Sequence, residues 1–385
     1  MFRPCEDRLA RVSPVAGSSM ISNVVQNLAV PTYRLPPEAY YSREWFEMER
    51  RELFARTWNL VAYESDVPAG DGACLPVRVL DAPYLLTRDG DGVIRGFVNM
   101  CRHRGMVLAE APTTCRTVRC EYHGWEYGLD GSLRRLPQRS SQFADVDTAD
   151  WGLVPVACAT WGGMIFVNPD GNASDLDVWL ADLPQHMGPF PRTDLVEVFR
   201  GRFPIASNWK FYVENHIDCY HLWYLHDESL KMNDHHLLWQ RNCGEHWTCG
   251  EPLRPGEETR DRGGVLPMPD LDAAEAALTR ANLIFPNIPQ TSGGHTFSTY
   301  QVLPLGPESS ELDLRIWAMP GSTLSDEAIA LTLAILVTED GFACEQMQRA
   351  VRSPAFEVGP LALVHEQPIS DLHAKLVRYF PSFTG

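Results

Sequence analysis

Two cysteines and two histidines form the strongest chemical signal in the sequence. Cys101 and His103 make a C-x-H pair, and Cys120 and His123 make a C-x-x-H pair further along. Pairs that mix thiolate and imidazole suit a [2Fe–2S] cluster in which two thiolates bind one iron and two imidazoles bind the other. Structural zinc usually keeps like ligands together in each pair, so zinc is the weaker interpretation. Cys115 lies between the pairs and is not expected to be a ligand.

A second set of candidate metal ligands follows in the pattern D-x-x-H-x₄-H, formed by Asp218, His221 and His226. Two imidazoles and one carboxylate can hold iron(II) and leave positions open for O₂ and a substrate. On a regular helix Asp218 and His221 would share one face, whereas His226 would diverge from His221. The helix is therefore expected to end or bulge near Tyr224. Alone, the H-x₄-H spacing is a weak signal.

Together the two sets resemble the motifs of the Rieske-type ring-hydroxylating oxygenase α-subunit family. The cluster motif matches as C-x-H and C-x-x-H-G-W, and the iron motif as the string N-W-K…E-N-x-x-D-x-Y-H-x₄-H that ends at His226. The resemblance extends from about Leu35 to Phe380, and the C-terminal spacing somewhat resembles the choline and glycine-betaine monooxygenase branch. It implies an α+β fold, with an all-β Rieske [2Fe–2S] domain inserted next to a helix-grip catalytic domain of antiparallel sheet plus helices.

The resemblance also implies the cofactors and their ligands. One [2Fe–2S] cluster would bind the two Cys–His pairs, and one Fe²⁺ would bind His221, His226 and a C-terminal aspartate that opens a helix. Asp340 in the string TEDGFACEQMQ is the expected aspartate, and Glu339 is its competitor. Glu345 is expected to have a supporting or structural role.

Asp218 has a different role in the family that the sequence resembles. It would bridge His221 to a cluster histidine, His123 or His103, of a neighbouring subunit in a head-to-tail homotrimer. Such a carboxylate would also orient the iron-ligand ring. His216, His235 and His236 are expected to be structural or pocket residues.

The implied activity is that of a terminal oxygenase. It would use O₂ and electrons from a separate NAD(P)H-dependent reductase, a ferredoxin or both, because no G-x-G-x-x-G follows a strand in this chain. The substrate would be a small organic molecule, either an aromatic compound or an N-methylated or quaternary amine, and the reaction a mono- or dioxygenation. Tyr212, Trp223 and Tyr224 could form an aromatic cage for a cation, although core packing is the more common role. The alternative is a Rieske electron carrier or a non-catalytic subunit, and the intact ligand set argues against it.

Composition limits the possible partners. The chain has 33 basic and 50 acidic residues, for a net charge of −17, which disfavours nucleic acid and anionic membranes but not a basic electron donor. There is no apolar run long enough to span a membrane and no secretory pattern near the start, so we expect a cytoplasmic protein with reduced thiols. A zinc site formed by Cys243, His246 and Cys249 is a minor alternative for those residues.

The remaining patterns predict how the chain is divided. Residues 1–30 are expected to be disordered, residues 57–168 to form the Rieske domain, and residues 31–56 plus 169–385 to form the catalytic domain. Apolar spacing predicts helices, and alternation around turn signals predicts strands. The expected helices are 37–56, 209–230, 324–352 and 362–379; the expected strands include 77–80, 84–88, 295–303 and 311–319; and 250–270 is expected to be a long loop.

Overall fold

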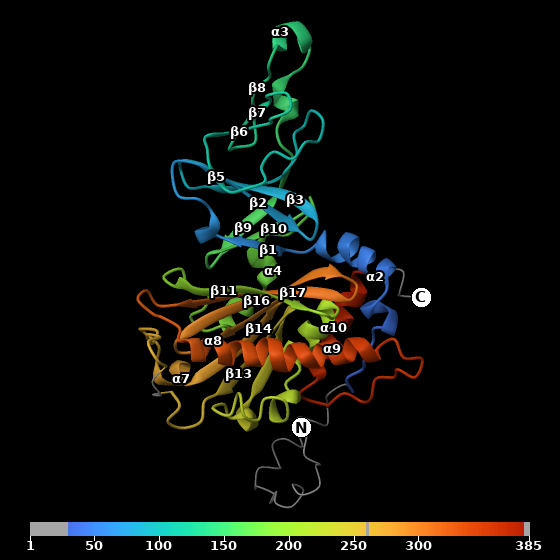
Figure 1. The fold of residues 1–385 in the computed structure, drawn as a ribbon, viewed down its shortest axis with the longest axis vertical. Coiled ribbons are helices and arrows are strands. Elements are labelled where there is room, and N and C mark those ends of the chain that lie inside the picture. The colour runs from blue at the N-terminus through green and yellow to red at the C-terminus, as the bar shows by residue number, and fades with distance from the viewer. Residues whose placement is uncertain (1–29, 259–261, 381–385) are drawn as a thin grey trace, which may run out of the picture.

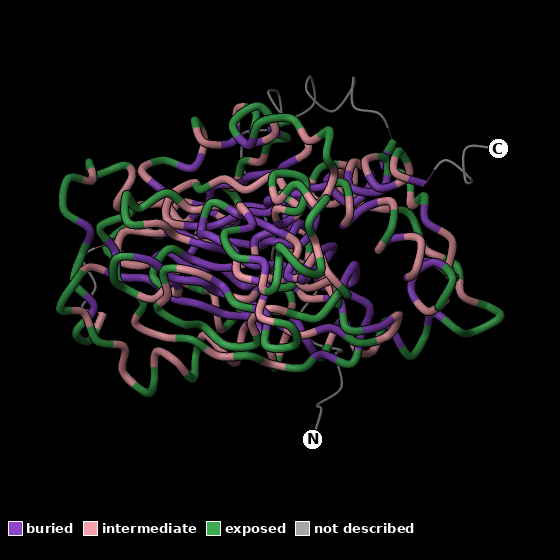
Figure 2. The backbone as a smooth tube through the Cα atoms, turned by 90° about the horizontal axis from the view of Figure 1, so that it is seen from above, coloured by how far each residue is buried: buried purple, intermediate pink, exposed green. Residues whose placement is uncertain are grey.

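The computed structural model describes residues 30–258 and 262–380. The segment expected to be disordered, 1–30, lies outside the described residues except for its last member. The molecule is elongated, with β6–β8 and α3 at one end and the long helical stretch of α8 and α9 in the opposite half (Figure 1). Seen from above, buried segments fill the interior and exposed segments form the rim (Figure 2). None of the helices in the described ranges could cross a bilayer.

The first half of the chain forms an antiparallel sheet with strand order β1-β10-β9-β4-β3-β2-β5. A small three-stranded sheet, β6-β7-β8, stands on its far side. Tyr127 and Trp125 lie in the apolar core of this region, together with Cys101 and Cys120. The strands are β1 (Asn59–Tyr63), β2 (Ala73–Val79), β3 (Ala82–Arg88), β4 (Ile94–Val98), β5 (Thr113–Thr114), β6 (Thr117–Arg119), β7 (Glu126–Gly128), β8 (Leu133–Arg135), β9 (Pro155–Trp161) and β10 (Met164–Asn168).

The second half is built on a seven-stranded antiparallel sheet with order β11-β17-β16-β15-β14-β13-β12. The stretch from α8 to α9 runs across it in one line (Figure 1). The expected pairing of 295–303 with 311–319 is found as β16 with β17. The strands are β11 (Val196–Ile205), β12 (Trp239–Cys243), β13 (His246–Pro252), β14 (Leu278–Ile284), β15 (Ile288–Ser292), β16 (Thr296–Gly306) and β17 (Ser309–Ala318).

The helices lie mainly around this second sheet. The predicted helix 37–56 is present as three successive helical segments between residues 37 and 54, and the predicted helix 362–379 is confirmed from residue 367 onward as α10. They are η1 (Pro37–Tyr40), α2 (Arg43–Met48), η2 (Glu49–Phe54), η3 (Glu64–Asp66), α3 (Arg139–Gln142), η4 (Thr148–Trp151), α4 (Leu176–Leu180), α5 (Leu183–His186), α6 (Trp209–Ile217), η5 (His221–Trp223), η6 (His235–Leu237), α7 (Ala273–Ala276), α8 (Asp326–Leu333), η7 (Ala334–Asp340), α9 (Gly341–Ala350) and α10 (Gln367–Arg378).

Helix α6 is the central helix of the larger core. Its first five residues are all buried, and four of them are apolar or aromatic, but the second, Lys210, is a charged residue with no exposed surface. Its Nζ contacts the equally buried Glu49 Oε1 at 2.5 Å, and Trp209 Nε1 donates to the other oxygen of Glu49 at 3.0 Å. This buried pair joins α6 to the N-terminal helical segment, and thereby fixes the helix that leads into the candidate iron ligands.

Candidate iron–sulfur and mononuclear iron sites

The four candidate cluster ligands lie on two loops with the same backbone hydrogen bonds. One loop follows β4, and the other joins β6 to β7. In each loop the N–H of the cysteine, Cys101 or Cys120, donates to the carbonyl oxygen five residues later at 2.8 Å. The fourth residue after each cysteine is a glycine, Gly105 or Gly124, with φ of 77° or 70°, a conformation that strains other residues. Equivalent turns therefore accommodate both the C-x-H and the C-x-x-H spacing.

The candidate ligands of the two loops face one another, with the cysteines buried and the histidines toward the surface. Cys101 and Cys120 are 2% and 1% exposed, whereas His103 and His123 reach the surface. The two histidines turn their Nδ1 atoms toward each other at 3.1 Å. Trp125 stacks on the ring of His103, with centroids 4.9 Å apart and an interplanar angle of 5°. The arrangement separates a sulfur pair from a nitrogen pair, as a dinuclear cluster with two kinds of iron requires.

The sulfurs lie among hydrogen-bond donors. Tyr127 Oη is 3.4 Å from Cys101 Sγ. Burial raises the pKa of the Cys120 thiol, as does the neighbouring Cys101 thiol, while two backbone N–H groups of its own loop oppose this. Such donors would stabilise anionic sulfur and raise the potential of a bound cluster. Cys115 pairs instead with Cys74, whose thiol hydrogen bond lowers the pKa of Cys115 to about 7.

The candidate iron ligands begin where α6 ends. The predicted helix 209–230 is too long, because α6 ends at Ile217 and Asp218 is its C-cap, with an extended backbone at φ −76° and ψ 107°. Asp218 Oδ1 accepts a hydrogen bond from Tyr220 N at 2.6 Å, which closes a tight turn. The prediction that Asp218 and His221 share one helix face was therefore wrong. His221 opens the 3₁₀ turn η5 instead, and this break turns His221 and His226 toward one another.

Two histidines from this segment and one aspartate from a distant helix converge behind this turn. Ligand atoms of His221, His226 and Asp340 all lie within 4.8 Å of one another. Asp340 Oδ1 is 3.0 Å from His226 Nε2 and 3.7 Å from His221 Nε2. The side chain of His221 is 16% exposed, that of His226 is 2% exposed, and that of Asp340 is 10% exposed. Two imidazole nitrogens and one carboxylate oxygen in such a protected group can hold iron and leave other coordination positions open.

Asp340 reaches this group from the middle of a helix. The expectation that it opens a helix was wrong, because α8, η7 and α9 are continuous and Asp340 is the last residue of the π-helical segment η7. A π-helical turn often occurs at functional sites, because it re-aims side chains within a helix. Glu339, the competitor, instead places Oε2 2.7 Å from His226 Nδ1 and accepts a hydrogen bond from Ser229 Oγ at 2.7 Å. Adjacent carboxylates thus contact opposite nitrogens of the same ring.

Asp218 lies on the outer side of His221. Its Oδ2 is 3.4 Å from His221 Nδ1, but this contact lacks hydrogen-bond geometry, and that buried nitrogen has no hydrogen-bond partner. The exposed rings of Tyr220 and Tyr224 lie near this turn, at 46% and 70% exposure. Asp218 therefore connects the iron-facing histidine with the molecular surface.

Family models account for both halves of the chain. The model "Ring hydroxylating alpha subunit (catalytic domain)" matches residues 190–382, and the model "Rieske [2Fe-2S] domain" matches residues 57–156. The chain belongs to the ring-hydroxylating oxygenase α-subunit family. Its fold is accordingly a Rieske domain joined to a helix-grip catalytic domain, as the sequence predicted, and the family's cofactors are a [2Fe–2S] cluster and a mononuclear iron.

Relatives of this α-subunit include proteins named as choline and glycine betaine monooxygenases and as a biphenyl dioxygenase. A choline monooxygenase of Spinacia oleracea is 27% identical over 97% of this chain and 84% of its own length. A glycine betaine monooxygenase oxygenase subunit of Pseudomonas aeruginosa is 33% identical, but the match covers 52% of this chain and only 46% of that protein. The biphenyl 2,3-dioxygenase α-subunit of Rhodococcus jostii is 34% identical over 56% of this chain and 48% of its own.

Solved structures show the same fold. The quaternary ammonium Rieske monooxygenase CntA superimposes with a TM-score of 0.75 at 21% identity, covering 92% of this chain and 97% of its own. Naphthalene 1,2-dioxygenase from a Rhodococcus species gives a TM-score of 0.73 at 20% identity, with coverage of 91% and 95%.

The side chains of this α-subunit fit both cofactors. In the Rieske domain the two Nδ1 atoms face each other without an intervening donor, and in the catalytic domain two Nε2 atoms face one carboxylate oxygen. We therefore propose Cys101, His103, Cys120 and His123 as the cluster ligands. We propose His221, His226 and Asp340 as the iron ligands, with Asp218 as the bridging residue.

Other residues singled out in the sequence have structural partners. Glu345 Oε1 accepts from Ala206 N at 3.0 Å. The ring of His216 is held between Asn282 O at 2.9 Å and Tyr300 Oη at 2.8 Å, and burial lowers its pKa to about 4. His235 Nδ1 contacts Glu251. The sequence did not identify Glu339 as a partner of His226, although its position beside Asp340 was noted.

The three aromatic residues considered for a cation cage lie in different surroundings. Tyr212 is fully buried, and its hydroxyl donates to Leu336 O at 2.8 Å. Trp223 contacts the ring of His365, with centroids 4.8 Å apart, while Tyr224 is mostly exposed. Within the described residues no ring contact joins any two of the three, so the cage hypothesis gains no support.

Proposed function

We propose that this chain is the terminal oxygenase component of a multicomponent enzyme that hydroxylates a small organic substrate with O₂. The observation that carries the proposal is the presence, in one chain, of two complete donor sets: a paired Cys–His set and a separate His–His–Asp set. An electron carrier needs only the first set. A mononuclear iron, when bound, supplies O₂ activation, and a [2Fe–2S] cluster supplies single electrons.

The protein side chains have distinct tasks in this scheme. Glu339 Oε2 accepts a hydrogen bond from Nδ1–H of His226 and so keeps Nε2 unprotonated and free to bind metal. Asp218 can accept from His221 Nδ1 and keeps that ring oriented. The buried position of His226 and Asp340 limits water at the ligand set, which protects reduced iron from unproductive reactions.

We further propose a head-to-tail homotrimer. In one chain the β6–β7 loop lies at the end of the molecule opposite α9, which follows Asp340 directly (Figure 1). A cluster at that loop is poorly placed to serve its own chain's iron, whereas a neighbour's loop could approach the exposed turn at Asp218. Repeating one such contact around a ring closes the assembly. For the domain boundaries, we propose residues 57–168 for the Rieske domain and residues 31–56 plus 169–385 for the catalytic domain.

Reducing equivalents would come from a separate NAD(P)H-dependent reductase, a ferredoxin or both. The net charge of −17 favours a donor with a positive docking face.

For the substrate we propose an N-methylated or quaternary amine, supported by the relationship to the choline monooxygenase over almost the whole chain. One oxygen atom would enter a C–H bond and the other would leave as water, with two electrons and two protons consumed. An aromatic substrate is the second candidate, supported by the biphenyl enzyme.

Asp218→Asn tests the central proposal. The variant should keep both metals, because Asp218 is not a ligand, and should lose turnover, because the bridge cannot carry a negative charge. Iron and acid-labile sulfide, at about three irons to two sulfides per chain, are measured alongside coupled O₂ consumption. Full coupled activity in this variant contradicts the bridging role. Formaldehyde release from trimethylated amines supports the amine substrate, and cis-diol formation from arenes contradicts it.

A further inference from the structure

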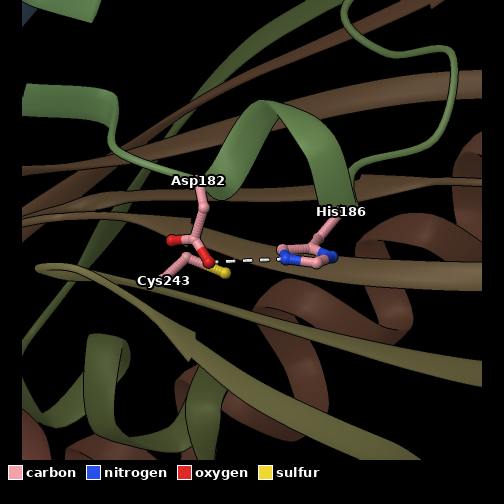
Figure 3. A group of neighbouring side chains, drawn as sticks. All are labelled: Asp182, His186 and Cys243. Atoms are coloured by element: carbon pink, nitrogen blue, oxygen red, sulfur yellow. Dashed lines mark ion pairs between the residues drawn. The ribbon is translucent and has the colours of Figure 1, made fainter. Parts of the chain in front are cut away.

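A second group of side chains that could bind a metal lies at the edge of the catalytic sheet, apart from the candidate iron site. Asp182 and His186 belong to the α5 segment, and Cys243 is the last residue of β12. Their candidate ligand atoms all lie within 4.8 Å of one another. The three side chains point toward a common space between the helical turn and the strand (Figure 3).

The backbone holds this group together from both sides. Asp182 and His186 are four residues apart, and Asp182 Oδ2 is 3.4 Å from His186 Nε2. The hairpin turn that follows Cys243 packs directly against the residue before Asp182, since a Cβ added to Gly244 would lie 2.9 Å from the Cβ of Ala181. Ala181 itself has φ 53° and ψ −128°, a combination that is costly for a residue with a side chain and that often marks a functional segment.

These ligands differ from the trio that the sequence suggested. His246 is unavailable, because Nε2 contacts Trp179 O at 2.8 Å and Nδ1 accepts from Phe285 N at 3.1 Å. Cys249 pairs opposite Gln240, three residues before Cys243, so alternation along the strand places the two cysteines on opposite faces of the hairpin. The fold thus separates Cys243 from its neighbours in sequence and brings it to Asp182 and His186.

We propose that Asp182, His186 and Cys243 form a transition-metal site of the zinc class, with water in the fourth position, that ties α5 to the β12–β13 hairpin. One sulfur, one nitrogen and one oxygen donor suit a borderline-soft ion that accepts tetrahedral geometry. Calcium and magnesium prefer oxygen ligands throughout. Cys243 has no exposed surface, while Asp182 and His186 are 46% and 24% exposed in their side chains, so an ion can enter from the surface.

Charged groups around Cys243 and His186 affect how an ion would bind there. Burial, together with Asp182, raises the pKa of Cys243 to about 11, so the thiol is protonated at neutral pH and the ion must displace that proton. Arg241 and Lys375 also face the thiol, and Arg241 Nη1 lies 2.9 Å from His186 Nε2. Because this guanidinium contacts the His186 nitrogen that would bind the ion, Arg241→Ala should increase the affinity for metal.

The experiment adds Co²⁺ or Zn²⁺ to the full-length protein with its iron centres loaded. We expect one equivalent of Co²⁺ per chain, with a thiolate-to-cobalt charge-transfer absorption that Cys243→Ser abolishes. Loss of a direct ligand in Asp182→Asn or His186→Gln should weaken binding by more than the roughly 10- to 100-fold that loss of an outer partner costs. Cys158→Ser, which removes a partly buried thiol outside this group, is the control and should bind Co²⁺ normally.

Two results would overturn the proposal: no Co²⁺ or Zn²⁺ bound beyond the iron centres, or binding that persists in Cys243→Ser. Should Cys243→Ser fold poorly, the partly exposed Asp182→Asn and His186→Gln variants decide, because both should lose binding without a packing defect. Zn²⁺ should also raise the unfolding temperature of the unsubstituted protein and leave that of His186→Gln unchanged. None of these outcomes depends on oxygenase activity.

Discussion

Replacing Glu339 by alanine should weaken iron binding without removing an iron ligand. Glu339 Oε2 lies 2.7 Å from Nδ1 of His226. With iron on Nε2 the ring proton must stay on Nδ1, and Glu339 then accepts it. The substitution removes this acceptor, so the ring loses the contact that fixes both its tautomer and its orientation.

The magnitude follows from the kind of hydrogen bond that is lost. A hydrogen bond to a charged group contributes about 1.5–3 kcal/mol, and the Glu339 side chain is 29% exposed, which favours the lower end. At 1.4 kcal/mol per factor of ten, a loss of about 1.5–2 kcal/mol corresponds to roughly ten- to thirtyfold weaker iron binding. Glu339→Gln can still accept at Nδ1 and should lose less.

The assay is an anaerobic Fe²⁺ titration against a colorimetric chelator, using protein that keeps its cluster but has been depleted of mononuclear iron. Glu345→Ala is the matched control, because this carboxylate lies on the same continuous helix and contacts Ala206 N rather than a histidine. The reasoning fails if Glu339→Ala binds iron as the unsubstituted protein does, or if Glu345→Ala loses as much affinity.

Three further predictions concern the core and the cluster loops. Lys210→Met should lower the free energy of unfolding by about 3–5 kcal/mol by leaving Glu49 buried and unpaired; adding Glu49→Gln should restore part of it in denaturant titrations. Burial lowers the pKa of His216 from its ordinary 6.5 to about 4 in the folded protein, so the unfolded chain binds more protons and stability falls as pH drops from 6.5 toward 4, by on the order of 3 kcal/mol. His216→Gln should flatten that profile. Cys115→Ser should keep the Rieske EPR signal and Cys120→Ser should lose it; equal loss would contradict the ligand assignment.

The cluster loops could be predicted from sequence because their geometry is local. Each ligand pair precedes a glycine at the position that needs a positive φ, and each lies between short strands with turn signals. Neither feature depends on distant packing. The β-rich character of the first half followed from the same alternation.

The helix boundaries around the iron site could not be predicted as well. Apolar spacing continues past residue 217 and predicted helix over 209–230 with an end or bulge near Tyr224, but the Asp218 side chain accepts from Tyr220 N and the helix already ends at Ile217. Likewise, the residue types at 334–340 do not predict a π-helical segment, because that segment depends on how the whole helix packs across the sheet. The structure brings His221, His226 and Asp340 together as the sequence led us to expect, whereas the backbone conformation that positions them could not be predicted.

The two carboxylates beside the iron-facing histidines differ in a way that separates their proposed roles. Glu339 Oε2 has two short contacts, to His226 Nδ1 and Ser229 Oγ, both at 2.7 Å. Asp218 Oδ2 stands 3.4 Å from His221 Nδ1, and that nitrogen lacks a hydrogen-bond partner. Glu339 Oε2 is therefore engaged by two donors within the chain, whereas Asp218 uses Oδ1 to hold Tyr220 N and leaves Oδ2 able to accept a hydrogen bond from an imidazole of another subunit. Substitution of Glu339 should therefore appear mainly in iron affinity, and substitution of Asp218 mainly in turnover.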